Sequence, residues 1–315
     1  MPAWKDGIPP PGPVRLQPLA RAKVASLGAA GTAWLDALPT RLVELEQQWS
    51  LTRGRSLPGG SASYVVRART RDGRDAVLKL SLPDPTFPIQ VATLRRAGGR
   101  GYVALLEADL VRSAVLLESL GPSLEQSRRP VPDRLRLLAD TLTLAWQPVG
   151  GSSQPYDKAG ELAEALQGRW AGLDRPCSEA VVERALACAE HLRRTSPDQL
   201  VHVHGDPHPG NLLAVPTPRP GAETGYCFVD PDGFVADRGY DLGVVLRDWS
   251  SHLDGRGART LLEGWCELLA ERTGVAAERI WEWAFLERVA TGLYVLSLGA
   301  ARAAGPFLRS AELLV

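Results

Sequence analysis

The chain has 315 residues, of which 36 are basic, 36 are acidic and 44% are apolar. This length and composition suffice for two lobes with a substantial core, and the zero net charge does not indicate a nucleic-acid partner. The N-terminus has no apolar segment after a basic one, and no apolar run approaches the ~20 residues of a membrane span. We therefore expect a soluble, cytoplasmic protein without membrane contact. Its scattered cysteines are expected to be reduced thiols: Cys177, Cys188, Cys227 and Cys266.

The N-terminal segment, residues 1–20, is rich in proline and glycine, so we expect an extended arm there. Between Thr32 and Trp49 apolar residues recur with helical spacing, which Pro39 interrupts. This pattern predicts one or two helices before the first sheet.

An antiparallel sheet is predicted over residues 57–80, because alternating strands flank the turn-forming pair Asp72-Gly73. Lys79 is the single charged residue in its apolar strand, where a charge needs a partner or a ligand. The alternative for Lys79 is an edge position from which the ammonium reaches water. Three small residues near the start of this stretch would suit a loop over phosphate groups or, equally, a surface turn that opens a strand: Gly59, Gly60 and Ser61.

The region after the hairpin is predicted to contain one helix and two strands, at residues 85–97, 102–109 and 112–119. The last strand and the connection after it contain Glu118 and Leu120, and the pair Gly121-Pro122 follows. We interpret this connection as a hinge between two lobes, where backbone groups can recognise adenine.

Helical patterns dominate from residue 132 onward, beginning with an apolar stripe at Leu135, Leu138 and Leu142. Four further helical segments are expected at residues 160–173, 178–194, 259–273 and 276–303. The predicted fold class is α+β. A small antiparallel lobe (residues 21–121) precedes a mostly helical lobe (residues 122–315), which is the order of the bilobal protein-kinase-like fold.

Three polar side chains follow short apolar, strand-like runs and are expected to converge. Asp206 and Asn211 lie in the sequence H-G-D-P-H-P-G-N, and Asp230 begins the sequence D-P-D-G. Phosphoryl transfer needs this set: one Asp that orients a hydroxyl and accepts its proton, and an Asn with a second Asp that hold Mg²⁺ on nucleotide phosphates. Kinases space their catalytic loop and metal-binding Asp in this way.

A metal-hydrolase interpretation competes for the same stretch. His202, His204, Asp206 and His208 alternate as H-x-H-x-D-x-H, and alternate residues of a strand share a face. The Asp and the last His are not adjacent, however, and the only later histidine is His252, which leaves too few ligands for a dinuclear site.

The runs H-G-D-P-H-P-G-N-L-L and V-D-P-D-G-F-V-A-D-R-G-Y-D-L-G resemble the aminoglycoside phosphotransferase family. The runs G-G-R-G-Y-V-A-L-L-E-A-D and A-V-L-L-E-S-L are similar to its streptomycin 6-phosphotransferase and hydroxyurea phosphotransferase branch. The similarity extends over nearly all of the chain beyond the first twenty or so residues.

The resemblance implies a role for several residues. Asp206 would be the catalytic base or orienting carboxylate, Asn211 and Asp230 would ligate Mg²⁺, and Lys79 would contact the α- and β-phosphates of ATP. Three residues would support the site: His204, His208 and Asp241. Two positions depart from the family pattern: Pro207 replaces an aliphatic residue, and Gln90 replaces the Glu that usually pairs with the strand lysine.

The expected function is therefore ATP- and Mg²⁺-dependent phosphorylation of a hydroxyl on a small molecule. The resemblance implies a cationic antibiotic such as streptomycin, with hydroxyurea or another metabolite as alternatives. A nucleotide-binding pseudokinase is the non-enzymatic alternative, since Gln90 supplies no charge to Lys79. The C-terminal helices are locally acidic, which solvated helix faces explain for most of the residues, but one or two are candidates to line the cleft and attract a cationic substrate: Asp248, Asp254, Glu263, Glu267, Glu282 and Glu287.

Overall fold

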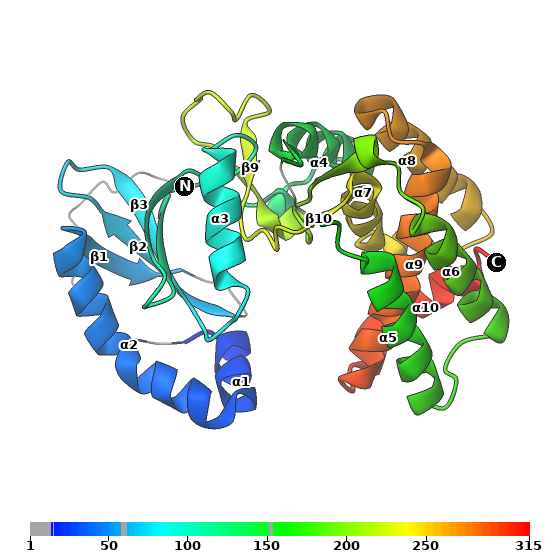
Figure 1. Ribbon diagram of the computed structural model, residues 1–315, viewed down its shortest axis with the longest axis horizontal. Coiled ribbons are helices and arrows are strands. Elements are labelled where there is room, and N and C mark those ends of the chain that lie inside the picture. Colours follow the sequence, from blue (N-terminus) through cyan, green and yellow to red (C-terminus); the bar gives the residue numbers. More distant parts are fainter. Residues whose placement is uncertain (1–13, 15, 58–61, 151–153) are drawn as a thin grey trace.

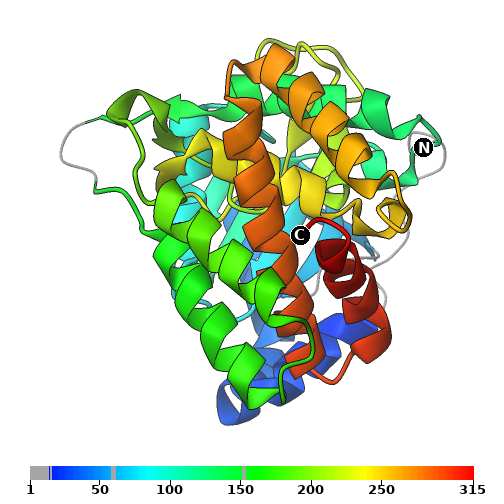
Figure 2. The same ribbon diagram turned by 90° about the vertical axis from the view of Figure 1, so that its right-hand side faces the viewer.

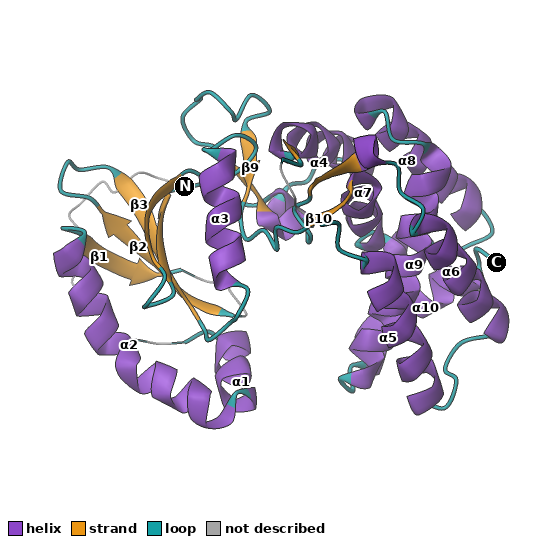
Figure 3. Cartoon of the chain, in the orientation of Figure 1, coloured by secondary structure: helices purple, strands orange, loops and turns teal. Residues whose placement is uncertain are grey.

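The computed structural model describes residue 14 and residues 16–57, 62–150 and 154–315. A sheet flanked by helices forms the N-terminal lobe, and a group of helices forms the C-terminal lobe (Figures 1 and 3). The elements of the first lobe are α1 (Pro18–Ser26), α2 (Gly28–Gln48), β1 (Thr52–Ser56), β2 (Ser63–Arg69), β3 (Asp75–Ser81), α3 (Phe87–Ala97), β4 (Leu105–Asp109) and β5 (Ala114–Glu118). The helices of the second are α4 (Val131–Ala145), α5 (Lys158–Gly172), α6 (Glu179–Leu192), α7 (Arg238–Arg247), α8 (Ala258–Thr273), α9 (Ala277–Ser297) and α10 (Ala301–Glu312).

The N-terminal sheet is antiparallel, with the strand order β1-β2-β3-β5-β4. β2 and β3 form the predicted hairpin, and its turn contains Gly73 with a φ of +86°. Glycine suits this left-handed position because it has no Cβ to clash with the following carbonyl. The hairpin prediction is therefore confirmed.

The two faces of this sheet contact different helices. Leu78 and Leu80 of β3 belong to one apolar cluster with the buried side of α2, where Trp34 Nε1 also donates to Ser81 O at 2.8 Å. Successive residues of a strand point to opposite faces. Lys79 therefore points away from α2, to the face on which α3 lies in Figure 1.

The N-terminal helices differ from the prediction at one point, because α1 begins at Pro18, inside the segment expected to be an extended arm. Of the one or two helices expected before the sheet, the structure has a single helix across Pro39, since α2 continues through it without a break. Pro39 is exposed, so the backbone carbonyl that loses its partner there can bind water. Leu38 and Leu42 on either side are fully buried, and this burial holds the helix together.

The C-terminal lobe is built around α9, which packs against α5, α6, α7, α8 and α10. Figure 2 shows α9 running through the middle of the lobe, with α5 and α6 on one side and α10 on the other. The predicted segment 276–303 divides at Gly299, whose φ is +80°, and α10 follows. Gly292, by contrast, lies inside α9 and does not interrupt it.

Short strands at the centre of the molecule carry the loops of interest. β7 (Leu200–His202) pairs with both β6 (Gln147–Pro148) and β10 (Val235–Asp237). β8 (Leu212–Ala214) and β9 (Tyr226–Phe228) form an antiparallel hairpin.

All four cysteines are buried and form no disulfide. Burial raises the pKa of the Cys188, Cys227 and Cys266 thiols to about 12, so these thiols are protonated at neutral pH. Across residues 16–57, 62–150 and 154–315, no helix combines the length and the apolar character that crossing a membrane requires.

Candidate active site

The predicted catalytic loop begins directly after β7. Gly205 has a φ of +95°, and a Cβ built on it would lie 2.6 Å from Asp232 Cβ, so only glycine fits there. The loop then turns sharply, because the Asp206 carbonyl oxygen accepts from His208 N at 2.9 Å and from Asn211 Nδ2 at 3.0 Å. This turn brings the Asp206 and Asn211 side chains to the same end of β7.

His204 supports this loop from inside the protein. Its ring is fully buried; Nδ1 accepts from Asp206 N at 3.1 Å, and Nε2 donates to Val229 O at 2.9 Å. Burial lowers the pKa of His204 to about 4, so the ring is neutral at physiological pH. A neutral ring with one donor and one acceptor is what these two backbone groups require.

Asp241, near the start of α7, holds the same loop from below. Its carboxylate accepts three hydrogen bonds: from His204 N at 2.9 Å, from Gly205 N at 2.9 Å and from Trp146 Nε1 at 2.8 Å. Burial raises the pKa of Asp241 to about 6, although these donors oppose the shift. The side chain is fully buried and contacts the backbone of the loop, so its position is that of a structural support.

Lys79 and Asp230 meet across the two lobes. The Lys79 ammonium donates to Asp230 Oδ1, and Lys79 is only 8% exposed. Asp230 has a φ of 57°, a left-handed conformation that is uncommon for residues other than glycine. Val229 N donates to Asn211 O at 2.9 Å, so the loops that carry Asn211 and Asp230 are also in direct contact.

Gln90, the residue expected near Lys79, lies on α3. In the described part of the chain, the hydrogen bond and ion pair of Lys79 are both made to Asp230 and neither involves Gln90. α3 is nevertheless packed close to the D-P-D-G segment, because a Cβ on Gly233 would lie 2.0 Å from Thr93 Oγ1.

Sequence reasoning missed Arg247, the last residue of α7. Its Nη2 donates to Asp206 Oδ1 at 2.9 Å, and its Nη1 lies 3.3 Å from Glu287 Oε2. Burial alone would raise the pKa of Asp206, but the Arg247 guanidinium, with smaller contributions from His208 and His204, holds that pKa below its usual range. Asp206 is therefore ionised and able to accept a proton. The Y-D-L-G-V-V-L-R spacing after D-P-D-G places Asp241 and Arg247 on one helix, but no sequence signal pairs Arg247 with Asp206.

Asp232 is the second residue that sequence reasoning missed. Its side chain is accessible to solvent, yet desolvation by the surrounding protein, followed by repulsion from Asp206, raises its pKa to about 6. Asp84 and Asp230 contribute to the same shift, and Lys158 opposes it. The site therefore contains more carboxylates than one catalytic base and one metal ligand require.

The donor set fits a magnesium ion bound together with a nucleotide. Asn211 and Asp230 offer an amide oxygen and a carboxylate, and Mg²⁺ is usually bound by one or two such groups plus phosphates and water. Over the described ranges, no three His, Cys, Asp or Glu side chains are grouped as a ready-made metal site. Such a site would therefore be completed by the nucleotide rather than by the protein alone.

The remaining predicted residues fall into three groups. Gly59, Gly60 and Ser61 lie outside the described residues. The Glu118 side chain is occupied, because its carboxylate accepts from Ala104 N at 2.7 Å and from Arg219 Nε at 2.9 Å. Leu120 lies in the connection after β5, where the next residue, Gly121, donates its N–H to Ala214 O at 2.8 Å.

The structure argues against the metal-hydrolase interpretation. His202 Nδ1 lies 3.2 Å from Arg96 Nη1, which makes it an acceptor and leaves it facing a cation. Both nitrogens of His204 are used by backbone groups. His208 Nδ1 accepts from Gly210 N at 3.1 Å. The histidines thus stabilise the loops and do not converge on one point.

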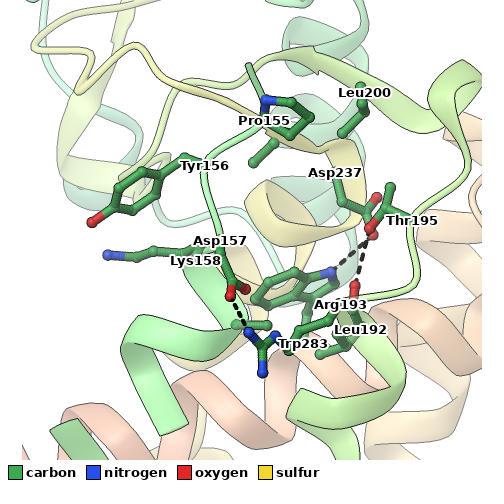
Figure 4. A pocket seen from close by; sticks show the side chains of 12 residues that line it. Pro155, Tyr156, Asp157, Lys158, Leu192, Arg193, Thr195, Leu200, Asp237 and Trp283 are labelled. Carbon is green, nitrogen blue, oxygen red and sulfur yellow. Dashed lines mark hydrogen bonds and ion pairs between the residues drawn. The ribbon is translucent and has the colours of Figure 1, made fainter. Parts of the chain in front are cut away.

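A cavity of about 220 Å³ lies beside α5, and neither Lys79 nor Asp206 lines it (Figure 4). Its lining includes Asp237 and Trp283, whose Nε1 donates to Asp237 Oδ2 at 3.1 Å. At its edge Arg193 pairs with Asp157 at 2.7 Å. Asp237 is also paired with Arg279, and the predicted site residues are not among those that line this cavity.

Comparison with known proteins identifies the chain's relatives. Residues 48–299 match the model of a family described as aminoglycoside/hydroxyurea antibiotic resistance kinase. A streptomycin 6-kinase of Streptomyces glaucescens is 29% identical over 289 residues, which cover 90% of this chain and 92% of that protein. A hydroxyurea phosphotransferase of Kitasatospora aureofaciens is 29% identical over 273 residues, covering 81% and 72%. The structure of an aminoglycoside phosphotransferase from Streptomyces rimosus with ADP and streptomycin shares the fold, with a TM-score of 0.50, 16% identity, and coverage of 81% of this chain and 98% of that one.

Proposed function

This chain belongs to the family of aminoglycoside/hydroxyurea antibiotic resistance kinases, and we propose that it transfers the γ-phosphoryl group of ATP to a hydroxyl of streptomycin or a related cationic aminoglycoside. The observation that carries the proposal is the meeting of Lys79 and Asp230 across the lobes, next to the loop of Asp206 and Asn211. These are the groups that kinases use for positioning and charge stabilisation.

Asp206 orients the acceptor hydroxyl and takes its proton as the oxygen bonds to phosphorus. Arg247 keeps this carboxylate ionised and fixes one of its oxygens, so the other, Oδ2, is the oxygen available to the acceptor. His208 Nε2 lies 3.7 Å from Oδ2, a distance that leaves the oxygen without a strong competing hydrogen bond. In-line transfer of this kind depends on orientation and preorganised charge rather than on a covalent intermediate.

Lys79 would hold the nucleotide phosphates, and Asn211 and Asp230 would hold Mg²⁺ together with the bound nucleotide. The ion would supply positive charge to the transferring phosphoryl group. Lys79 and Asp230 pair with each other in this structure, so each would have to exchange its partner for a phosphate or the metal. The buried position of Lys79 favours that exchange, because a phosphate can take over the counter-charge that Asp230 provides.

A cationic acceptor is supported by the surplus of carboxylates. Asp232 is accessible and its carboxylate is repelled by Asp206 and Asp84, while Lys158 opposes this repulsion at Asp232. An acceptor with ammonium or guanidinium groups would relieve this repulsion. Two of the acidic residues named from the C-terminal helices, Asp248 and Glu287, lie instead around Arg247. Glu282 pairs with His191 at 2.8 Å.

Hydroxyurea is the second candidate acceptor, because one relative is a hydroxyurea phosphotransferase. The two candidates are separated by incubating the purified protein with ATP, Mg²⁺ and each compound, and by measuring the mass gain of one phosphate. We expect phosphorylated streptomycin. Phosphorylation of hydroxyurea alone would replace the acceptor, and absence of ATP consumption with a broad set of antibiotics and hydroxylated metabolites would favour the pseudokinase alternative.

A further inference from the structure

The loop between β8 and β9 is longer than a hairpin turn needs, and the site described above does not account for it. It starts after Ala214 and ends before Tyr226. Figure 1 shows this loop, beside β9, reaching over toward the end of α3 in the N-terminal lobe. The loop contains one arginine, Arg219, in the middle of the run P-T-P-R-P-G-A.

Every N–H of the Arg219 guanidinium has a partner. Nε donates to Glu118 Oε2 at 2.9 Å, Nη2 donates to Glu118 Oε1 and to Tyr102 O, the latter at 2.9 Å, and Nη1 donates to Gly99 O at 2.7 Å and Pro220 O at 3.1 Å. The Arg219 and Glu118 side chains are only 21% and 20% exposed. The hydrogen bonds to Glu118 raise the pKa of Arg219. A bidentate, largely buried pair of this kind fixes geometry more tightly than a surface ion pair does.

Glu118 is the last residue of β5 and stands immediately before the interlobe connection. The connection itself is attached to β8, since Gly121 N donates to Ala214 O at 2.8 Å and Ala214 N donates to Pro122 O at 3.0 Å. The Arg219 pair therefore holds one end of the connection, and β8 holds the other.

The β8–β9 hairpin also carries both candidate metal ligands. Asn211 stands directly before β8, and only Val229 separates β9 from Asp230. On the β9 side the hairpin is joined to the first lobe by Val103 N, which donates to Phe228 O at 2.9 Å. Arg219 thus ties the tip of the hairpin that carries these ligands to the strand that leads into the connection.

We infer that Arg219 is a positioning residue for the nucleotide. By pairing with Glu118, it sets the distance between the connection, where the base would bind, and the hairpin whose ends would hold the metal on the phosphates. This inference rests on the proposed function. Arg219 lies outside the catalytic loop. Nucleotide binding depends on it, and acceptor binding does not.

The test uses Arg219→Lys, which keeps the charge but cannot reproduce the fork of five donors. Arg256→Lys is the matched control, because Arg256 is exposed and lies before α8. Binding of ADP with Mg²⁺ is measured by calorimetry, the KM values for ATP and for streptomycin by steady-state kinetics, and the melting temperature by calorimetric scan. We expect Arg219→Lys to weaken ADP binding and raise the KM for ATP by about tenfold or more, from the loss of charge-assisted hydrogen bonds. The KM for streptomycin should not change, and Arg256→Lys should behave as the wild type.

Unchanged ADP affinity in Arg219→Lys would overturn the inference. A parallel rise of the KM values for ATP and for streptomycin, together with a lowered melting temperature, would overturn it as well. If Arg219→Lys does not fold, Glu118→Gln serves instead, since its one amide oxygen can still accept from Ala104 N and Arg219 Nη2, whereas the charge and the acceptor for Arg219 Nε are lost. Misfolding of both variants would show a purely structural pair and would also overturn it. Failure of the wild type to bind ADP or ATP would refute the proposed function itself, which distinguishes the two failures.

Discussion

The Arg247 guanidinium donates to the Asp206 carboxylate at 2.9 Å, and it is the one cation that the structure places in hydrogen-bond contact with this carboxylate among the described residues. Arg247 also faces Glu287, which is 3% exposed, and Asp248. The pair links the catalytic loop to the helices of the C-terminal lobe, and it decides the ionisation state of the group on which the reaction depends.

Replacement Arg247→Gln is expected to lower kcat and to shift the acid limb of the pH profile of kcat/KM to higher pH. The sign follows from the loss of the cation, because the pKa of Asp206 rises and a higher pH is then needed to ionise it. The buried Glu287 also loses its partner, at a cost of about 3–5 kcal/mol of unfolding free energy. Arg247→Lys should recover part of kcat and part of the unfolding free energy that Arg247→Gln loses. An unshifted acid limb in a folded Arg247→Gln protein would contradict the role.

Replacement Lys79→Met should separate activity from stability. The ammonium is buried, so an apolar side chain of similar shape avoids its desolvation, and the Asp230 carboxylate that loses this partner is 42% exposed and can bind water. The unfolding free energy should therefore stay within about 1 kcal/mol of the wild type. The KM for ATP should increase about tenfold or more, because a charge-assisted contact to phosphate is lost. Kinetics and chemical denaturation of the same preparation measure both. A normal KM for ATP would remove Lys79 from the site.

Replacement Gly205→Ala should slow catalysis by roughly a hundredfold, because the new Cβ would lie 2.6 Å from Asp232 Cβ in a backbone with a φ of +95°, and a displaced catalytic loop misaligns Asp206. Strain should also cost about 1–3 kcal/mol of unfolding free energy. Gly264→Ala in α8 is the control, since no heavy atom lies within 4 Å of its added Cβ, and alanine should stabilise that helix. Equal activity of the two variants would show that the loop tolerates a side chain at Gly205.

Burial of the neutral His204 ring should make the unfolding free energy depend on pH. Its pKa is about 4 in the folded protein and 6.5 as a free side chain, so protons bind the unfolded chain preferentially between these values. The neutral ring contributes about 3 kcal/mol to the unfolding free energy. This contribution is complete above pH 6.5 and is lost as the pH falls toward 4. The unfolding free energy of the wild type minus that of His204→Gln, which cannot titrate, should therefore shrink on acidification. A difference that stays constant with pH would contradict burial of a neutral ring.

The sequence predicts the local features well, and the reason is physical. The β2–β3 hairpin depends on Asp72-Gly73, and the stripe of Leu135, Leu138 and Leu142 depends on the period of one helix, so neighbouring residues carry the information. The order of a small β lobe and a helical lobe follows from such patterns.

Long-range partners could not be predicted in this way. Arg247 and Asp206 are 41 residues apart, and Arg219 and Glu118 are 101 residues apart, so nothing local indicates that either pair meets. By family pattern Gln90 stands where a Glu usually pairs with the strand lysine, and the structure shows that the contact of Lys79 is made by Asp230 instead. The local pattern around the exposed Pro39 left one or two helices open, and the tertiary burial of its neighbours Leu38 and Leu42 explains why α2 is continuous.

The most direct measurement compares the wild type with Asp206→Asn in the presence of ATP, Mg²⁺ and streptomycin, following phosphorylated product by mass spectrometry and nucleotide binding by calorimetry. Asparagine can still accept from Arg247, but it cannot take a proton from a hydroxyl. Product formation should fall by roughly 10²–10⁴-fold while nucleotide affinity is retained. Transfer at the wild-type rate by Asp206→Asn would contradict the assignment of the reaction to this loop.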